Sequence, residues 1–372
     1  MMAHPIWAEV DLSAIAHNVG EVRRVVKPQA KVMAVVKANG YGHGAVPVAK
    51  TALANGADCL AVARLGEALV LRKSGITGSI LLLGYTPPEQ YQELIANDLT
   101  QTVYTLPMAR ELNSAALKMG KQLTIHIKID TGMGRLGFIP DENSLAEIEQ
   151  IKQLPQLNVE GIFTHFAKAD AWDKAYVNLQ FERFTTFIDK LSQRGIKFKL
   201  RHAANSAAII DHPDTHLDMV RAGIMMYGLY PSSEVNRDRV ILKPAMALKT
   251  RVAHIKRLPA GNHISYGCRY CTEMETTIAT LPLGYADGFT RMLKKGEVLV
   301  AGQRAPVVGS ICMDQCMVDL GSNQTVQTGD EVVVIGCQGD CCIPVEELAE
   351  KLGTINYELV CMVATRVPRI YK

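Results

Sequence analysis

The chain has 372 residues, of which 48% are hydrophobic and 21% charged, and its formal net charge is +3. This length exceeds what a single hydrophobic core usually supports, so we expect two domains. Because basic and acidic residues are interspersed, the charge pattern favours a small-molecule substrate over nucleic acid or a membrane surface. The start shows no basic segment followed by an apolar one, and no apolar run approaches the ~20 residues that span a bilayer. We therefore expect a cytoplasmic protein.

The nine cysteines form an odd count, which suits free thiols in a reducing compartment better than a disulfide framework. Cys268 and Cys271 form a CxxC pair, and Cys337, Cys341 and Cys342 cluster further along. No second CxxC and no neighbouring histidine pair accompanies them, so we expect plain thiols and no metal site.

The first part of the chain alternates short apolar runs with longer amphipathic stretches. Eight of the runs predict strands: Val32–Val36, Asp58–Ala63, Ser79–Gly84, Thr100–Tyr104, Leu123–Ile129, Val159–His165, Phe198–His202 and Leu217–Arg221. Helical patterns lie between them: Leu65–Lys73, Pro88–Ala96, Met108–Met119, Ser144–Leu154 and Val177–Gln193. Eight strands with room for a helix after each predict a (β/α)8 barrel in preference to an open doubly wound sheet, with a short helix after the seventh strand.

The pattern changes after about Pro231 to short alternating segments rich in Gly and Pro, which predict a mostly β second domain. Its strands are expected at Met246–Ile255, Thr276–Leu281, Glu297–Val300, Ala305–Val308, Met317–Leu320 and Glu331–Ile335, with one helix at Val345–Leu352. The predicted fold is thus α/β, with a barrel over residues 1–240 and a C-terminal β domain over residues 241–372. The segment Trp7–Val10, within the first ~10 residues, could join the β domain.

Chemically reactive side chains gather where the predicted barrel strands end. In active barrels the working residues lie at this C-terminal face. The residues concerned are Lys37, Lys128, Arg135, His165, His202, Asn205, Ser206, Arg221 and Gly223. Ser206 and the backbone of Gly223 and Ile224 follow strands seven and eight, where barrels often bind phosphate.

Lys37 follows the apolar run of the first barrel strand. Burial lowers the pKa of an ammonium group, and a neutral lysine amine can form a Schiff base with a carbonyl. For any single lysine the ordinary alternative is a side chain that extends from the strand end to water. A lone His165 would more often be a core histidine, and a lone Arg221 a structural ion-pair partner. Their common position on one rim favours the functional interpretation.

These segments resemble the alanine racemase family over nearly the whole chain. The motifs that carry the resemblance are Val35–Gly44, Lys128–Gly137, Arg201–Ser206, Arg221–Ile224 with Tyr227-Gly228, Ser265–Gly267, Gly284–Gly288, Cys312–Gln315 and Asn356–Glu358. Each motif alone is weak, but the set in this order and spacing is specific.

The resemblance implies a pyridoxal 5'-phosphate cofactor joined to Lys37 as a Schiff base. Its phosphate would contact Tyr41, Ser206, the backbone of Gly223 and Ile224, and Tyr357, with Asn205 nearby. His165 would lie beside the pyridine ring, Arg135 near the phenolic oxygen and Arg221 at the ring nitrogen. Lys128 matches a lysine that is carbamylated in relatives, where it orients Arg135.

The resemblance further implies a homodimer in which the second domain of one subunit supplies Tyr266, Met313 and Asp314 to the barrel of the other, with Arg135, Met313 and Asp314 contacting substrate. Racemisation removes the Cα proton from one face and returns a proton to the other, so two bases should face each other. Lys37 would serve the D face and an ionised Tyr266 the L face. The implied reaction interconverts L- and D-alanine and supplies D-alanine for peptidoglycan.

Several alternatives compete with this interpretation. Gly132–Gly137 satisfies GxGxxG after a strand, but Pro140 intervenes and the helix pattern starts later, which argues against a nicotinamide enzyme. A non-catalytic pyridoxal-phosphate barrel would lack the second domain. Related two-domain decarboxylases need more room for a distal group than Tyr357 and Met313 are expected to leave.

The nearest rival is a serine/alanine racemase of broader specificity, because apolar packing alone rejects an added hydroxyl poorly. One residue departs from the family pattern. Ser310 stands where relatives often carry a larger polar residue, which bears on the support of its loop and on substrate preference.

Overall fold

The computed structural model describes residues 4–323 and 325–372. The chain folds into two compact units. One unit holds Ala14–Gly40 and Ala45–Pro244. The other holds the described residues up to Ser13, together with Tyr41–Gly44 and Ala245–Lys372. We call the first the barrel unit and the second the β unit.

The barrel unit contains eight parallel strands in the order β8-β7-β6-β5-β4-β3-β2-β9. Their bounds are β2 (Lys31–Val35), β3 (Cys59–Val62), β4 (Ile80–Leu82), β5 (Thr100–Val103), β6 (Leu123–Lys128), β7 (Leu157–Phe163), β8 (Leu200–His202) and β9 (Met219–Ala222). The backbone N–H of Arg221 donates to the Ala204 carbonyl at 3.0 Å, next to the end of β8, so the two edge strands approach each other. The sheet therefore forms a nearly closed barrel, as predicted.

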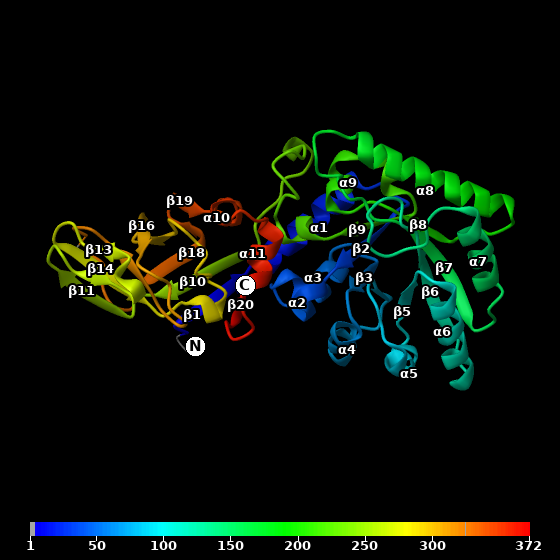
Figure 1. Ribbon diagram of the computed structural model, residues 1–372, viewed down its shortest axis with the longest axis horizontal. Coiled ribbons are helices and arrows are strands. Elements are labelled where there is room, and N and C mark those ends of the chain that lie inside the picture. Colours follow the sequence, from blue (N-terminus) through cyan, green and yellow to red (C-terminus); the bar gives the residue numbers. More distant parts are fainter. Residues whose placement is uncertain (1–3, 324) are drawn as a thin grey trace. The chain divides into compact units, whose positions relative to one another are not determined.

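Helices lie on the outside of these strands (Figure 1), and α4 and α6 pack on the strands that precede and follow them. The α-helices are α1 (Leu12–Val25), α2 (Lys37–Tyr41), α3 (Ala45–Ala54), α4 (Leu65–Lys73), α5 (Tyr91–Ala96), α6 (Leu106–Lys118), α7 (Glu142–Lys152), α8 (Ala175–Gln193) and α9 (Ser206–Asp211). Short 3-10 turns are η1 (Pro88–Gln90), η2 (Pro213–His216), η3 (Ile224–Tyr227) and η4 (Arg237–Arg239). The helix after the seventh barrel strand, α9, is short, as predicted. No helix within the described residues is both long and apolar enough to cross a membrane.

The β unit contains a largely antiparallel sheet in the order β11-β14-β17-β16-β15-β18-β10-β1-β20, with β19 paired to β18, and a separate two-stranded sheet of β12 and β13. Its strands are β1 (Ile6–Val10), β10 (Met246–Arg251), β11 (His254–Leu258), β12 (His263–Ile264), β13 (Tyr270–Cys271), β14 (Thr276–Leu281), β15 (Glu297–Val300), β16 (Gln303–Val308), β17 (Cys316–Asp319), β18 (Glu331–Gln338), β19 (Cys341–Ile343) and β20 (Arg369–Tyr371). It also carries η5 (Tyr266–Cys268), η6 (Tyr285–Asp287), α10 (Val345–Leu352) and α11 (Asn356–Met362). The N-terminal strand β1 pairs with β10 and β20 within this sheet.

One predicted strand is wrong. The alternation over Met246–Ile255 predicts a single strand, but the structure has β10 ending at Arg251 and β11 beginning at His254. The two strands lie in different parts of the sheet, since β10 pairs with β1 and β18, whereas β11 pairs with β14. The break falls at Val252 and Ala253, which periodicity does not distinguish from the flanking residues.

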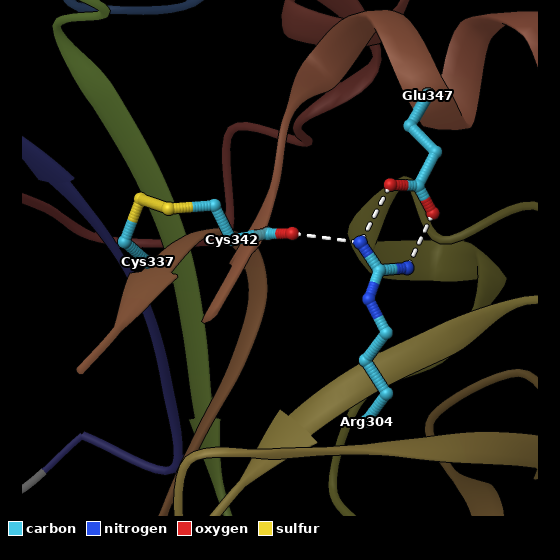
Figure 2. The surroundings of a disulfide bond; sticks show 4 residues. All are labelled: Arg304, Cys337, Cys342 and Glu347. Atoms are coloured by element: carbon cyan, nitrogen blue, oxygen red, sulfur yellow. Dashed lines mark hydrogen bonds and ion pairs between the residues drawn. A yellow bond between two sulfur atoms is a disulfide. The ribbon is translucent and has the colours of Figure 1, made fainter. Parts of the chain in front are cut away.

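The expectation of plain thiols is also wrong for two cysteines. Cys337 and Cys342 are directly opposite each other in the β18–β19 hairpin, with a Cα–Cα distance of 4.1 Å, and they form a disulfide. Figure 2 shows Arg304 beside this hairpin, donating to the Cys342 carbonyl at 2.7 Å and ion-paired with Glu347. Among the described residues, Cys268 and Cys271 form no disulfide. Sequence spacing alone did not reveal the cross-strand register.

Candidate active site

Lys37 lies two residues after the end of β2 and begins a turn of unusual backbone conformation. Ala38, Asn39 and Gly40 all have left-handed dihedral angles, with φ of 52°, 52° and 61°. Such a conformation costs about 1–2 kcal/mol for each residue other than glycine. Surrounding contacts must therefore hold this turn in place.

Three hydrogen bonds brace the Lys37 turn. The backbone N–H of Ala38 donates to Glu67 Oε1 at 2.6 Å, and Gly40 N–H donates to the Val36 carbonyl at 2.9 Å. Asn39 Oδ1 accepts from Ala45 N–H at 2.9 Å. Glu67 stands in the first turn of α4, and its other oxygen accepts from the N–H of Ala63 at 2.8 Å. One carboxylate thus ties the loop after β2 to the loop after β3.

Arg221 is a buried cation in β9, 4% exposed. Its Nη2 donates to the Thr164 and Ala203 carbonyls at 2.7 and 2.9 Å, and its Nη1 donates to His202 Nδ1 at 2.9 Å. Within residues 4–323 and 325–372, no carboxylate lies within ion-pair distance of it. Burial and the neighbouring Arg135 lower its pKa to about 9. A buried guanidinium with only neutral partners is a site where an electron-rich group is stabilised.

The Arg221 contacts fix a chain of histidine tautomers. A guanidinium only donates, so His202 Nδ1 must accept, and its Nε2 is left to donate to His126 Nδ1 at 2.9 Å. His126 Nε2 then points its proton toward Glu160 Oε2 at 3.5 Å. Burial first, and Arg221 second, hold the pKa of His202 well below its usual value, which agrees with a neutral ring. The hydrogen bond from His126 lowers the pKa of Glu160 to about 2.

His165 and Lys128 lie on the same rim. His165 Nδ1 faces Arg221 Nη2 at 3.2 Å, and burial with Arg221 nearby lowers its pKa well below the usual value. Lys128, at the end of β6, is 5% exposed and donates to the Ile129 carbonyl at 2.7 Å. Burial, followed by repulsion from Arg221, lowers its pKa to about 7. A large share of Lys128 is therefore a neutral amine near neutral pH.

Arg135 stands on an exposed loop organised by Asp130. One Asp130 carboxylate accepts the backbone N–H of Gly132, Met133, Gly134 and Arg135 at 2.8–3.1 Å. Burial raises the pKa of this carboxyl, but the four N–H donors outweigh that effect and hold it below the usual value. The GxGxxG match thus lies in a loop around a carboxylate and opens no helix, since α7 begins at Glu142. This geometry excludes the nicotinamide alternative.

Ser206 and Asn205 lie at the start of α9. Ser206 Oγ accepts the backbone N–H of Gly223 at 2.9 Å and of Met225 at 3.4 Å, which joins the loops after β8 and β9. Ile224 begins η3 and is fully buried. Asn205 is the N-cap of α9, where its Oδ1 accepts from Ala208 N–H at 3.1 Å. The structure thus gives Asn205 a helix-capping contact.

In the β unit, Tyr266 projects from a tight loop with 72% of its surface exposed. The preceding Ser265 has φ 63° and ψ −176°, a conformation that costs about 1–3 kcal/mol for a residue with a side chain. Ser310 Oγ donates to the Tyr266 carbonyl at 2.9 Å, and Ser265 Oγ donates to the Ser310 carbonyl at 2.5 Å. Ser310, the residue that departs from the family pattern, therefore contacts the Tyr266 backbone directly.

Met313 and Asp314 share the neighbouring loop of the β unit. Met313 is 54% exposed, and its carbonyl accepts from Ala286 N–H at 3.0 Å. Asp314 accepts from Arg366 at 2.7 Å, and Arg366 also pairs with the buried Asp287 at 2.7 Å. Tyr41 and Tyr357 also belong to the β unit, with ring centroids 6.3 Å apart, and burial raises the pKa of Tyr41. The sequence-predicted residues thus fall into two sets, one in each unit.

Three contributors were not anticipated from the sequence: Glu67, His126 and Glu160. His126 stands two residues before Lys128 on β6, so both side chains point to the same side of the strand, and this spacing was an available signal. Glu67 gave no comparable signal, because its partner Ala38 contributes only a backbone N–H.

Two family models match the chain. The alanine racemase N-terminal domain covers residues 10–231, and the alanine racemase C-terminal domain covers residues 245–371. A nearly closed parallel barrel with a lysine at a strand end and a mostly β second unit agrees with both matches. The fold and the site thus define a pyridoxal-phosphate-dependent racemase, an isomerase.

Individual relatives agree with the family models. An alanine racemase of Methanococcus maripaludis is 56% identical over 371 residues, with 100% of both chains covered. A solved alanine racemase of Clostridium difficile 630 superposes with a TM-score of 0.97 at 45% identity, covering 100% of this chain and 97% of that one. The alanine racemase of Bacillus anthracis, solved with bound L-Ala-P, gives a TM-score of 0.95 at 42% identity over 100% and 96% of the two chains. The chain belongs to the alanine racemase family.

Proposed function

We propose that the chain interconverts L- and D-alanine, with Lys37 and Tyr266 as proton carriers on opposite faces of Cα. The observation that carries this proposal is the buried Arg221 on the same barrel rim as Lys37, since its hydrogen-bond partners in the described part of the chain are all neutral. The relatives named above are alanine racemases, and one of them is solved with bound L-Ala-P. The alternative of a broader serine/alanine racemase is not favoured.

The donor set of the barrel rim fits pyridoxal phosphate, the cofactor of the family. Lys37 offers a primary amine, the Arg221 guanidinium suits the ring nitrogen, and the Ser206 hydroxyl with the Gly223 and Ile224 backbone suits a phosphate. His165 would adjoin the ring, Arg135 would meet the phenolic oxygen, and Asn205, Tyr41 and Tyr357 are further candidates carried over from the family. When bound, this cofactor supplies an electron-withdrawing ring that acidifies the Cα–H of the amino acid.

Arg221 limits the side reactions of that ring. A carboxylate at the ring nitrogen would keep it protonated and give a strong electron sink, whereas a guanidinium disfavours that proton. The His202–His126–Glu160 chain holds the guanidinium in place by accepting from it. We expect Arg221→Glu to slow racemisation and to raise the yield of pyruvate from alanine. An unchanged ratio of pyruvate to D-alanine would contradict this role.

Two bases are required because one base cannot easily remove a proton from one face and deliver it to the other. Lys37 would hold or release the proton on the D face and Tyr266 on the L face. We propose further that the protein is a homodimer in which Tyr266, Met313 and Asp314 act in the site of the partner copy, with Met313 and Asp314 bordering the substrate together with Arg135. The family role supplies D-alanine for peptidoglycan, and we place the reaction in the cytoplasm.

Lys128 is proposed to carry a carbamate. Its neutral amine, which follows from a pKa of about 7, is the form that reacts with carbon dioxide. The product would place a negative charge beside Arg221 and Arg135, both of which already act on Lys128 electrostatically.

The deciding experiment is chiral analysis of the product from cofactor-loaded protein given L-alanine or L-serine. We expect D-alanine to appear much faster than D-serine and to vanish in Lys37→Ala. Comparable D-serine would restore the broader racemase, and no D-product from either substrate would refute racemisation.

A further inference from the structure

The loop that carries Tyr266 is held by a second segment of the β unit, Gly309–Cys312. Gly309 has φ of 70°, and a Cβ atom placed there would lie 2.7 Å from the Ile264 carbonyl oxygen. Only glycine allows the two backbones to approach so closely. Ile264 and Val308, which precede the two segments, are buried together with Ile278 in one small apolar cluster. The cluster anchors both segments at the point where they meet.

Beyond this anchor, two serine hydroxyls link the two segments, one donated from each segment to the other. Ser265 Oγ donates to the Ser310 carbonyl at 2.5 Å, and Ser310 Oγ donates to the Tyr266 carbonyl at 2.9 Å. Ser310 is buried, so water competes weakly for these bonds. The two bonds hold the backbone on both sides of the Ser265–Tyr266 peptide.

The Tyr266 side chain depends on this backbone for its direction. Tyr266 is 72% exposed, so packing within the β unit does little to fix its side chain. Ser265, with φ of 63°, has a conformation that a residue with a side chain keeps only when its surroundings impose it. Without the serine pair, the segment would relax toward ordinary dihedral angles and turn the phenol away.

We propose that Ser310 is a positioning residue for Tyr266, and that this chain orients its tyrosine base through the hydroxyls of Ser265 and Ser310. The inference rests on the proposed role of Tyr266 in the reaction. Ser310 acts through the Tyr266 backbone, so its loss should affect the proton step on the L face and leave the step on the D face in place.

The test compares Ser310→Ala with Ser310→Thr, which keeps a hydroxyl, and with Thr272→Val. Thr272 Oγ1 donates to the Pro259 carbonyl at 2.7 Å at the base of the β12–β13 hairpin that carries Tyr266. This control therefore removes a comparable hydroxyl–carbonyl bond from the same hairpin and leaves both serine bonds in place. The measurements are kcat, KM, Tm and the primary isotope effect with alanine deuterated at Cα, taken separately from L-alanine and from D-alanine.

We expect Ser310→Ala to lower kcat about tenfold, because a small misplacement of a reacting group has a large effect on rate. The isotope effect should rise with deuterated L-alanine and not with deuterated D-alanine, since only the L-face step becomes slower. Ser310→Thr should restore the wild-type values, and Thr272→Val should lower Tm without changing either isotope effect.

Unchanged isotope effects in Ser310→Ala, with an active wild-type enzyme, would overturn the inference alone. A rise in both directions would also overturn it, because general loosening of the site would then explain the data. A wild-type enzyme that leaves L-alanine unchanged would overturn the proposed function itself, so the two failures are distinguishable.

Discussion

Lys37 and Tyr266 lie in different units, yet each belongs to a segment with left-handed backbone. The Lys37 turn lies among charged groups of the barrel rim and is held by the Glu67 carboxylate. The Tyr266 loop is held by two neutral hydroxyls, and its phenol is exposed. The Lys37 turn is thus held by a charged acceptor, whereas the Tyr266 loop is held by close backbone contact and neutral hydrogen bonds.

The largest effect is expected when Lys37 or Tyr266 is replaced. Combining the two variants tests whether Lys37 and Tyr266 act together within one subunit or across two. Lys37→Ala and Tyr266→Phe should each lower racemisation about a thousandfold or more. A hybrid dimer of the two variants, purified through two different tags, should regain about half of the wild-type activity if the sites are shared, because one of its two sites then has both side chains.

The controls for the hybrid are the two variant homodimers at the same concentration. A hybrid as inactive as its parents would show that Lys37 and Tyr266 of one chain serve the same site.

The next effect concerns the brace on the Lys37 turn. Glu67→Gln keeps one acceptor oxygen but presents an amide group to the remaining backbone donors, Ala63 or Ala38. We expect kcat to fall about tenfold and attachment of the cofactor to Lys37 to weaken, since a displaced group reacts more slowly. Attachment is measured by borohydride reduction and mass spectrometry of the Lys37 peptide.

The matched control is Asp58→Asn, because Asp58 accepts from Val32 N–H at 2.7 Å, near the opposite end of the same strand β2. This variant should lose stability only. If both variants lose the same stability and neither changes kcat or attachment, the Glu67 contact has a purely structural role.

A smaller effect is the pH dependence of Lys128 on the charged barrel rim, which has no counterpart in the neutral hydroxyls that hold the Tyr266 loop. Because the Lys128 pKa is lowered to about 7, its amine is protonated below that pH and neutral above it. Carbamate on Lys128 should therefore rise as pH increases from about 6 to about 8, whereas ordinary lysines require pH near 10.4. Isotope-labelled bicarbonate with NMR detection measures the adduct, and Lys128→Met should abolish the signal. A signal that does not change over this range would contradict the assignment.

The smallest effect is expected at Asn205. As the N-cap of α9, its replacement by Ala should lower the free energy of unfolding by about 1 kcal/mol. Asp141 caps α7 through Ser144 N–H at 2.8 Å, and Asp141→Ala is the matched comparison in urea unfolding. If both variants lose the same free energy of unfolding and cofactor affinity is unchanged, Asn205 only caps α9. A weaker cofactor affinity in Asn205→Ala alone would support its predicted place near the cofactor.

The sequence allowed the barrel and its rim to be predicted, because short apolar runs and the residues that follow them are local features. Leu65–Lys73 was predicted with the bounds of α4, and the barrel strands were placed within a few residues. The Ser310–Tyr266 bond joins residues 44 apart, and the Cys337–Cys342 bridge depends on hairpin register. The first contact is non-local, and the second requires a strand register that the apolar pattern does not specify. The left-handed angles of Ala38 and Ser265 are equally hidden, because neither residue type signals positive φ.

The donor chain from Arg221 through His202 and His126 to Glu160 has one further consequence. Each imidazole has its proton on Nε2, and the order cannot reverse while the guanidinium remains charged. The Nδ1 atom of His202 therefore responds to any change in the hydrogen bond that it accepts from Arg221. NMR of ring-labelled histidine would register a change in the Arg221 environment through the Nδ1 resonance of His202, without any probe placed in the substrate's path.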